Sequence, residues 1–348
     1  MTAHNRTHLL NNFLGGTRMK LASICRTKEI RGHEFPAIIR NGPCYFLINL
    51  QVFADGLVNC WQMVDLPIFK EKLRRGWVVT SIPEKEALNI HGIGITAVNG
   101  PEWVHTPKSL VGFVEEVVMS LNPRLENLYD CHGRDTYAVN TDNPRPWKTD
   151  QPISPLVHGM FGASLHHFHI GDGSFHLVNI QLFKDDSAII FGRSEPVTLP
   201  FNELVQQLEK RDRFRLPERG DQVVIDGLVK FTCGDWDYRV EPNALLAEFH
   251  DLHDRVHGRP GAIQECVRAY EHYMAEPSSN AMEALRQKYE AVPEHLRMYC
   301  GDMDTKDIPI RMILYGKGEI ENWSHYQLAK QLGQELPSIT IPEPPKEP

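Results

Sequence analysis

The stretches YFLINLQVFAD, at residues 45–55, and FHLVNIQLFKD, at residues 175–185, carry the predicted fold. They start 130 residues apart, and five residues recur in place: Leu47 and Leu177, Asn49 and Asn179, Gln51 and Gln181, Phe53 and Phe183, Asp55 and Asp185. Further matches follow in the same order, and a helical run follows Pro107 and Pro242 alike. An ordered series of matches at one long offset predicts a duplicated domain rather than a short-period solenoid.

Each copy is predicted to run β-β-β-α-β-β-α. Asn41-Gly42 and Gly171-Asp172-Gly173 are typical hairpin turns, because glycine and asparagine tolerate the positive φ that such turns need. The strand after each turn alternates with a period of two residues. The first copy continues with predicted strands over 57–64, 77–82 and 88–98, and predicted helices over 67–75 and 107–121. Hairpin links favour mostly antiparallel sheets, so the predicted class is α+β.

The rest of the chain is predicted to be a linker, a mainly helical region and a tail. The predicted boundaries are 1–32 for an N-terminal segment, 33–121 for repeat unit 1, 122–157 for a Pro-rich linker, 158–257 for repeat unit 2, 258–335 for the helical region and 336–348 for a Pro-rich tail. Within the helical region, the pattern predicts helices over 262–274 and 280–291, a strand over 310–315, and a helix over 319–332 capped by Gly333.

The composition of the 348 residues is that of an ordinary globular protein. Hydrophobic residues make up 41% and charged residues 24%, which excludes collagen, coiled coil and wholesale disorder. The net charge of −8 excludes a nucleic-acid binder that works through bulk positive charge. Seven widely spaced cysteines without a C-x-x-C pair indicate reduced thiols. With no apolar stretch long enough for a membrane helix or a secretory signal, the predicted location is the cytoplasm.

Histidines gather in the second copy and make the first candidate site. His167 and His169 are two residues apart on a predicted strand, so they share a face. A two-residue loop at Asp172-Gly173 would place His169 opposite His176. Three imidazoles can bind zinc, iron, nickel or copper. The competing interpretation is that these are structural positions in a sheet, because the first copy carries Ala37, Ile39 and Phe46 at the equivalent places.

The repeated Asn-x-Gln pairs make the second candidate site. Asn49 and Gln51 recur as Asn179 and Gln181, and a buried amide is costly unless it is hydrogen-bonded. One interpretation is a satisfied structural network, and the other is a set of polar groups lining a groove between the copies. Trp323 is predicted to dock the last helix onto the repeats.

A third candidate lies in the acidic stretch that ends the second copy. His250, His253, Asp254 and His257 share one face of a predicted helix, and His and Asp at i, i+3 and i+4 can bind a metal ion. A solvated face with local ion pairs is the more ordinary interpretation.

The absence of a catalytic set shared by both copies favours recognition over chemistry. The first hypothesis is a non-enzymatic protein-binding module, acting as a partner or inhibitor in a microbial defence or toxin–immunity setting. An acidic surface suits a basic protein partner. Two alternatives stay open: a metal-dependent hydrolase that uses the histidines of repeat unit 2 with a divalent transition metal, and a small-ligand sensor that binds between the repeats. No other cofactor and no membrane partner is predicted, and homo-oligomerisation stays open.

Overall fold

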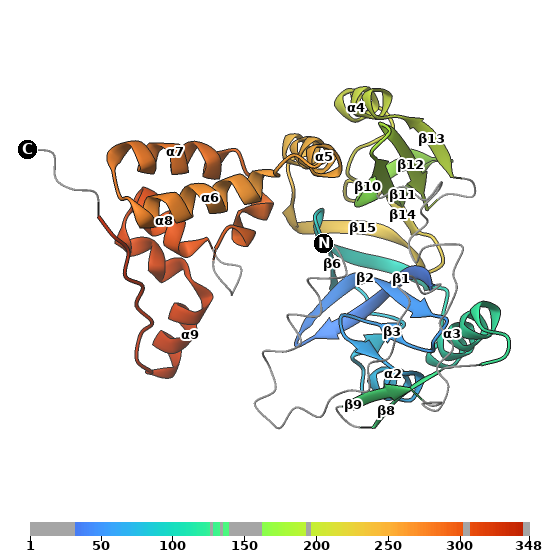
Figure 1. Ribbon diagram of the computed structural model, residues 1–348. Coiled ribbons are helices and arrows are strands. Elements are labelled where there is room, and N and C mark those ends of the chain that lie inside the picture. Colours follow the sequence, from blue (N-terminus) through green and yellow to red (C-terminus); the bar gives the residue numbers. More distant parts are fainter. Residues whose placement is uncertain are drawn as a thin grey trace, which may run out of the picture. The chain divides into compact units, whose positions relative to one another are not determined.

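The computed structural model describes residues 32–125, 128–132, 135–138, 162–192, 196–301 and 307–343. The chain divides into two compact units. Figure 1 labels the helices and strands of the chain. The smaller unit comprises Met1–Glu34, Leu50–Arg75 and Val111–Pro155, and the larger unit comprises the remainder. Helices combine with a large, mostly antiparallel sheet, so the predicted α+β class is confirmed. Within the described residues, no helix has both the length and the apolar character needed to cross a membrane.

A long sheet forms the centre of the larger unit. Its strands are β1 (Gly32–Asn41), β2 (Cys44–Phe53), β5 (Val78–Val79), β6 (Ala87–Ile90), β7 (Gly94–Trp103), β10 (Gly162–Gly171), β11 (Ser174–Phe183), β12 (Ser187–Phe191), β13 (Val197–Pro200), β14 (Gln222–Ile225) and β15 (Val229–Arg239). The hydrogen-bonded order is β13-β12-β11-β14-β15-β7-β6-β2-β1-β5, and β10 pairs with β11. Among the described residues, the pairings of β2 with β6 and of β11 with β14 are parallel.

The β10–β11 hairpin forms as its turn residues predict. Asp172 and Gly173 both have left-handed backbones, with φ of 51° and 76°. Two such residues match the twist of a two-residue hairpin, and Asp and Gly tolerate this conformation best. The register pairs His169 with His176, which confirms the predicted two-residue loop.

The antiparallel pair β7–β15 joins the two halves of this sheet. The Val104 N–H donates to Leu228 O at 2.9 Å at one end, and the Val240 N–H donates to Ile93 O at 2.8 Å at the other. A continuous apolar core lies against these central strands; it includes Leu88, Ile90, Val98, Phe168, Val223, Ile225, Phe231 and Cys233. The centre of the sheet is therefore part of the apolar core of the larger unit.

Helices α4 (Phe201–Lys210) and α5 (Pro242–Val256) cover a second apolar core in the larger unit. Alternating residues of β11 meet the apolar faces of both helices in this core, which contains Val178, Ile180, Leu182, Leu204, Leu208, Phe214, Phe249 and Leu252. α5 contacts both β10 and β11. This packing fixes which face of α5 points toward the loop between β11 and β12.

The smaller unit is built around short strands and two helical segments. β3 (Val58–Asn59), β4 (Met63–Val64), α2 (Leu66–Arg74) and the C-terminal part of α3 (Pro107–Leu121) belong to it, with the hairpin β8 (Tyr129–His132) and β9 (Asp135–Ala138). Asp65 caps α2 by accepting from the Ile68 N–H at 2.9 Å, and Pro67 stands in the first turn, where no N–H is needed. The Asn122 amide donates to Ala54 O at 2.9 Å and ties the end of α3 to a turn.

The C-terminal region of the larger unit is helical, as predicted. It contains α6 (Ala262–Ala275), α7 (Ser279–Glu290), the 3-10 helix η3 (Glu294–Tyr299), α8 (Ile308–Tyr315), the 3-10 helix η4 (Lys317–Asn322) and α9 (Ser324–Leu332). These elements enclose their own apolar core around Tyr273, Leu285 and Ile310. The Pro-rich tail forms neither helix nor strand over its described residues, and its Pro342 O accepts from the Tyr273 hydroxyl at 2.9 Å.

Several predicted elements differ from the structure. The strand predicted over 310–315 is wrong, because this segment is the helix α8, buried on nearly every side. The helix predicted over 319–332 begins later, at Ser324 after η4, and its predicted cap at Gly333 is confirmed by a left-handed φ of 64°. The strand predicted over 88–98 is broken by a turn at Gly92 into β6 and β7. The strand predicted over 57–64 is split into β3 and β4, and the strand predicted over 77–82 is reduced to β5.

The predicted linker contains the β8–β9 hairpin, while residues 139–157 lie outside the described residues. The predicted N-terminal segment lies outside them except for Gly32.

Candidate functional site

An exposed tryptophan stands at the tip of a short hairpin in the smaller unit. β3 and β4 pair through Asn59 and Met63, and the three residues between them form the turn. Trp61 in this turn is 55% exposed and has a left-handed backbone with φ of 71°. This conformation is an outlier for a bulky side chain. Met63, 38% exposed, adds a second apolar side chain, and we call residues 59–63 the Trp61 hairpin.

Gln51 fixes the base of the Trp61 hairpin. Its Nε2 donates to Glu34 Oε2 at 3.2 Å, and its Oε1 accepts from Asn59 Nδ2 at 3.0 Å. The turn itself is closed by the Cys60 N–H, which donates to Gln62 O at 3.2 Å. Gln51, predicted as a binding residue, therefore holds the strand on which the Trp61 hairpin is mounted. Asn49 lies two residues earlier on β2 and is half-buried.

The other predicted binding residues occupy separate elements of the larger unit. Gln181 is buried in β11, and Asn179 Oδ1 in the same strand has no hydrogen-bond partner among the described residues. Trp323 precedes α9, with its ring centroid 5.1 Å from that of His325. Its buried indole Nε1 also lacks a partner in the described part of the chain.

Two of the three histidines in the predicted cluster are packed among aromatic rings. His167 and His169 are buried, and their rings meet the edge of Phe214 at centroid distances of 5.6 Å and 5.0 Å. His167 Nδ1 lies 2.9 Å from Phe168 O. The nitrogens of His167, His169 and His176 are not among the ligand groups that converge within 4.8 Å in the described residues. The contacts of His167 and His169 therefore support the structural interpretation.

Burial of His167 predicts a loss of stability in mild acid. Burial lowers the pKa of His167 to about 4, and it lowers the pKa of His166 to about 4, with a smaller contribution from His91. In the unfolded chain these histidines have a pKa near 6.5. The unfolded chain therefore binds more protons than the folded chain between pH 6.5 and 4. Stability is present above pH 6.5 and falls toward pH 4, by up to about 1.4 kcal/mol per pH unit for each histidine.

Urea unfolding of His167→Phe at pH 7, 6 and 5 checks this expectation. Phenylalanine removes the titrating group while keeping a ring against Phe214, so the midpoint should depend less steeply on pH than in the wild type. An unchanged pH dependence would show that the His167 imidazole is not held neutral by burial.

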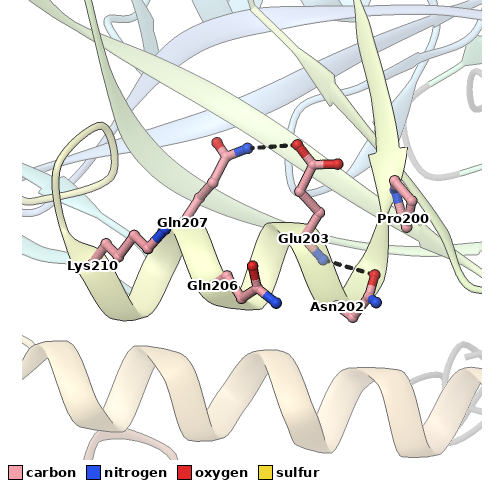
Figure 2. Close-up of a pocket in the computed structure, with 6 residues that line it drawn as sticks. All are labelled: Pro200, Asn202, Glu203, Gln206, Gln207 and Lys210. Atoms are coloured by element: carbon pink, nitrogen blue, oxygen red, sulfur yellow. Dashed lines mark hydrogen bonds between the residues drawn. The ribbon is translucent and has the colours of Figure 1, made fainter.

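An open polar depression runs along α4 (Figure 2). Its volume is about 540 Å³, and its lining residues are Pro200, Asn202, Glu203, Gln206, Gln207 and Lys210. The Gln207 Nε2 donates to Glu203 Oε1 at 3.3 Å, and Asn202 Oδ1 accepts from the Glu203 N–H at 2.9 Å. Small-molecule sites are usually enclosed and largely apolar. One polar helix face does not have that character, so it does not support the sensor alternative.

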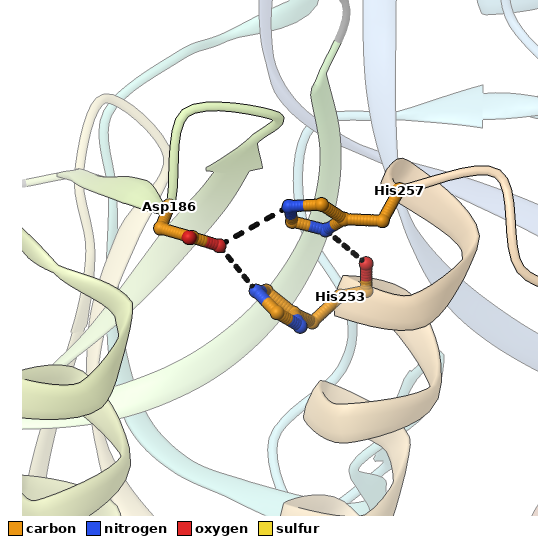
Figure 3. A group of neighbouring side chains, drawn as sticks. All are labelled: Asp186, His253 and His257. Carbon is orange, nitrogen blue, oxygen red and sulfur yellow. Dashed lines mark hydrogen bonds and ion pairs between the residues drawn. The ribbon is translucent and has the colours of Figure 1, made fainter.

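A carboxylate and two imidazoles meet where α5 approaches the β11–β12 turn (Figure 3). Asp186 Oδ1 lies 2.7 Å from His253 Nε2 and 3.2 Å from His257 Nε2. The three ligand atoms lie within 4.8 Å of one another. Two imidazoles and one carboxylate are a typical donor set for a divalent transition metal. These are the described residues best arranged to hold one.

Part of this group could be found from the sequence. The spacing of His253 and His257 places both on one helix face, and the sequence indicated their face as a candidate. The acid predicted to join them was Asp254, but Asp254 Oδ1 instead accepts a hydrogen bond from Arg259 Nη2 at 2.5 Å. Asp186 comes from a turn 67 residues before His253, and only the tertiary packing of α5 brings it near.

Comparison with known families identifies two segments and no activity. Residues 20–125 match DUF7638 and residues 261–338 match DUF7639, each described as a domain of unknown function. The first match contains the Trp61 hairpin, and the second covers most of the C-terminal helical region. No curated protein and no solved structure matches the chain.

Proposed function

We propose that the chain is a non-enzymatic protein-binding module whose main contact is the Trp61 hairpin. The observation that carries this proposal is the exposed Trp61 side chain on a left-handed backbone. Tryptophan is enriched among the few residues that dominate binding energy at protein interfaces. Strained backbone tends to persist where function requires it. A rigid hairpin that presents a large aromatic ring suits docking into a pocket of a partner.

We further propose that the two halves of the large sheet derive from one duplicated unit. Equivalent backbone bonds support this: Lys85 N–H donates to Val98 O at 2.8 Å, and Gly220 N–H donates to Cys233 O at 2.9 Å. The β2–β6 and β11–β14 pairings are both parallel. The second copy continues as the strand β12 where the first forms the Trp61 hairpin. Duplication would thus have freed the first copy to acquire a binding element of its own.

The proposed partner is a basic protein. A net charge of −8 would speed association with a positively charged partner, and salt would slow it. The microbial defence or toxin–immunity setting and the cytoplasmic location belong to this same proposal. Because the central contact is an apolar ring, affinity should depend on Trp61 more strongly than on salt.

Affinity capture with matched variants tests the proposal. Wild-type chain, Trp61→Ala and Met119→Ala are immobilised separately and exposed to lysate of the source cells. Met119 on α3 is 57% exposed, so its replacement removes a comparable apolar surface elsewhere in the smaller unit. We expect one protein to be retained by the wild type and by Met119→Ala, and to be lost with Trp61→Ala. Equal retention by all three would contradict the proposed contact.

A further inference from the structure

We propose that Asp186, His253 and His257 form a binding site for one divalent transition-metal ion, with zinc as the best-suited ion. The site lies on the larger unit and is independent of the proposed protein-binding function. His253 lies in α5, His257 caps the C-terminus of this helix one helical turn later, and Asp186 follows β11. The side chains of His253 and His257 are 18% and 20% exposed, and that of Asp186 is 65% exposed. An ion held there would keep a coordination position open to solvent.

The imidazole rings are held in orientations that suit metal binding. His257 Nδ1 lies 2.9 Å from His253 O, so its N–H can donate to that carbonyl and leave the Nε2 lone pair facing Asp186. Metal-binding histidines commonly have such a backbone partner on the other nitrogen. The His253 ring stacks on Phe201, with centroids 3.9 Å apart and planes 8° apart. The backbone N–H of Phe201 donates to Asp186 O at 2.8 Å, so one residue positions two of the ligands.

The contact between His257 and Asp186 calls for a positive charge between them when His257 Nδ1–H donates to the His253 carbonyl. If His257 Nδ1–H donates to the carbonyl, the Nε2 of the neutral ring and Asp186 Oδ1 are both acceptors, 3.2 Å apart. Either an extra proton or a metal ion resolves this contact. The neighbouring acids already have other partners, since Asp254 binds Arg259 and Asp251 binds Arg255. Asp186 alone among these acids has imidazoles as its ion-pair partners in the described structure.

The left-handed backbone of Asp186 would suit glycine better than aspartate. Its φ is 61°, and the corresponding turn after β2 has Gly56 at this position with φ of 80°. The two turns share a bond, because the Gly56 N–H donates to Phe53 O at 2.9 Å and the Asp186 N–H donates to Phe183 O at 3.2 Å. Glycine adopts this conformation without penalty. Aspartate is less suited to it and adds only a carboxylate, which faces the two histidines.

The spacing needs only a small adjustment to admit zinc. Bonds of about 2.0–2.2 Å in a tetrahedron place neighbouring ligand atoms about 3.3–3.6 Å apart. The present separations from Asp186 Oδ1 are 2.7 Å to His253 and 3.2 Å to His257. The largest change is at His253, where the separation must open by roughly 0.6–0.9 Å; the exposed Asp186 can supply it by rotating its side chain. Three protein ligands and an open position are the arrangement of zinc sites that accept a further ligand.

The experiment is a zinc titration of full-length chain prepared without a histidine tag and stripped with EDTA. Isothermal titration calorimetry should give one Zn²⁺ per chain, and zinc should raise the melting temperature. His253→Ala and Asp186→Gly should each weaken binding roughly 100-fold, since even second-shell changes cost 10–100-fold. His250→Ala, an exposed histidine of the same helix, should bind zinc like the wild type.

Two further readouts separate this site from the alternatives. Asp186→Gly should keep or raise the melting temperature of the zinc-free chain, because glycine prefers the left-handed backbone. Cobalt in place of zinc should show d–d absorption without a thiolate charge-transfer band. A wild type that binds no zinc, zinc binding that survives both ligand replacements, or a cobalt–thiolate band would each overturn the site.

Discussion

Replacing His295 with leucine is expected to lower the free energy of unfolding by about 3–5 kcal/mol. His295 Nε2 in η3 lies 2.8 Å from Glu248 Oε2 in α5, and both side chains are less than a tenth exposed. Leucine leaves the Glu248 carboxylate buried without its partner, which costs far more than the pair itself contributes. Urea unfolding measures the loss of stability. Amide hydrogen exchange should become faster in α5 and η3, which would locate the loss in these two elements.

The double variant Glu248→Leu, His295→Leu is the control. Two apolar side chains of suitable size leave no unpaired charge, so the double variant should be markedly more stable than His295→Leu alone. A double variant in which the two losses simply add would show that the pair is not coupled. The pKa of Tyr299 gives a second readout. Burial raises the pKa of its phenol, and the nearby Glu248 carboxylate raises it further. Removing the Glu248 charge should therefore lower the pKa of Tyr299.

Gly94→Ala should be about as damaging, at roughly 3–5 kcal/mol. Gly94 begins β7 with φ of 152°, where an added Cβ would lie 2.4 Å from Tyr238 O and 2.9 Å from the Trp236 ring. The carbonyl belongs to β15, so the backbone of the central strand pair must move. The register of β7 and β15 already shifts beside Trp236 and Tyr238. The closest contact is with a backbone carbonyl, which cannot rotate away as the end of a flexible side chain can.

Gly92→Ala gives the matched comparison two residues earlier. Gly92 also has a left-handed φ, 77°, but nothing lies within 4 Å of an added Cβ. Only the backbone penalty of about 1–2 kcal/mol is then expected. If Gly94→Ala were no more destabilising than Gly92→Ala in urea unfolding, close strand contact at Gly94 would not limit stability.

The sequence predicted the elements whose pattern is local. Period-two alternation located β2 and β11, and the apolar stripe with Pro107 located α3 at its observed bounds. Asp172-Gly173 fixed the β10–β11 register, because only residues that tolerate positive φ form that turn. The strand predicted over 310–315 was wrong because the segment Ile308–Tyr315 is buried on nearly all sides. A short apolar run of this kind has no period that distinguishes a helix from a strand.

The candidate sites were harder to predict because they depend on packing or on strain. The turn that exposes Trp61 was not predicted. One continuous strand was predicted over 57–64, because nothing in the residue types required a turn there. His253 and His257 could be paired by helix spacing, but Asp186 lies far away in sequence and joins them only because α5 packs on β11. The Glu248–His295 pair likewise links two elements with no sequence pattern in common.

Recognition through the Trp61 hairpin is tested most directly by the affinity of Trp61→Gly for the protein captured by the wild-type chain. Glycine relieves the left-handed strain at φ of 71° and removes the exposed ring. We expect binding to weaken at least about 30-fold, the loss typical of a dominant interface residue, while the urea midpoint stays the same or rises. Unchanged affinity in a chain of unchanged stability would contradict recognition through the Trp61 hairpin.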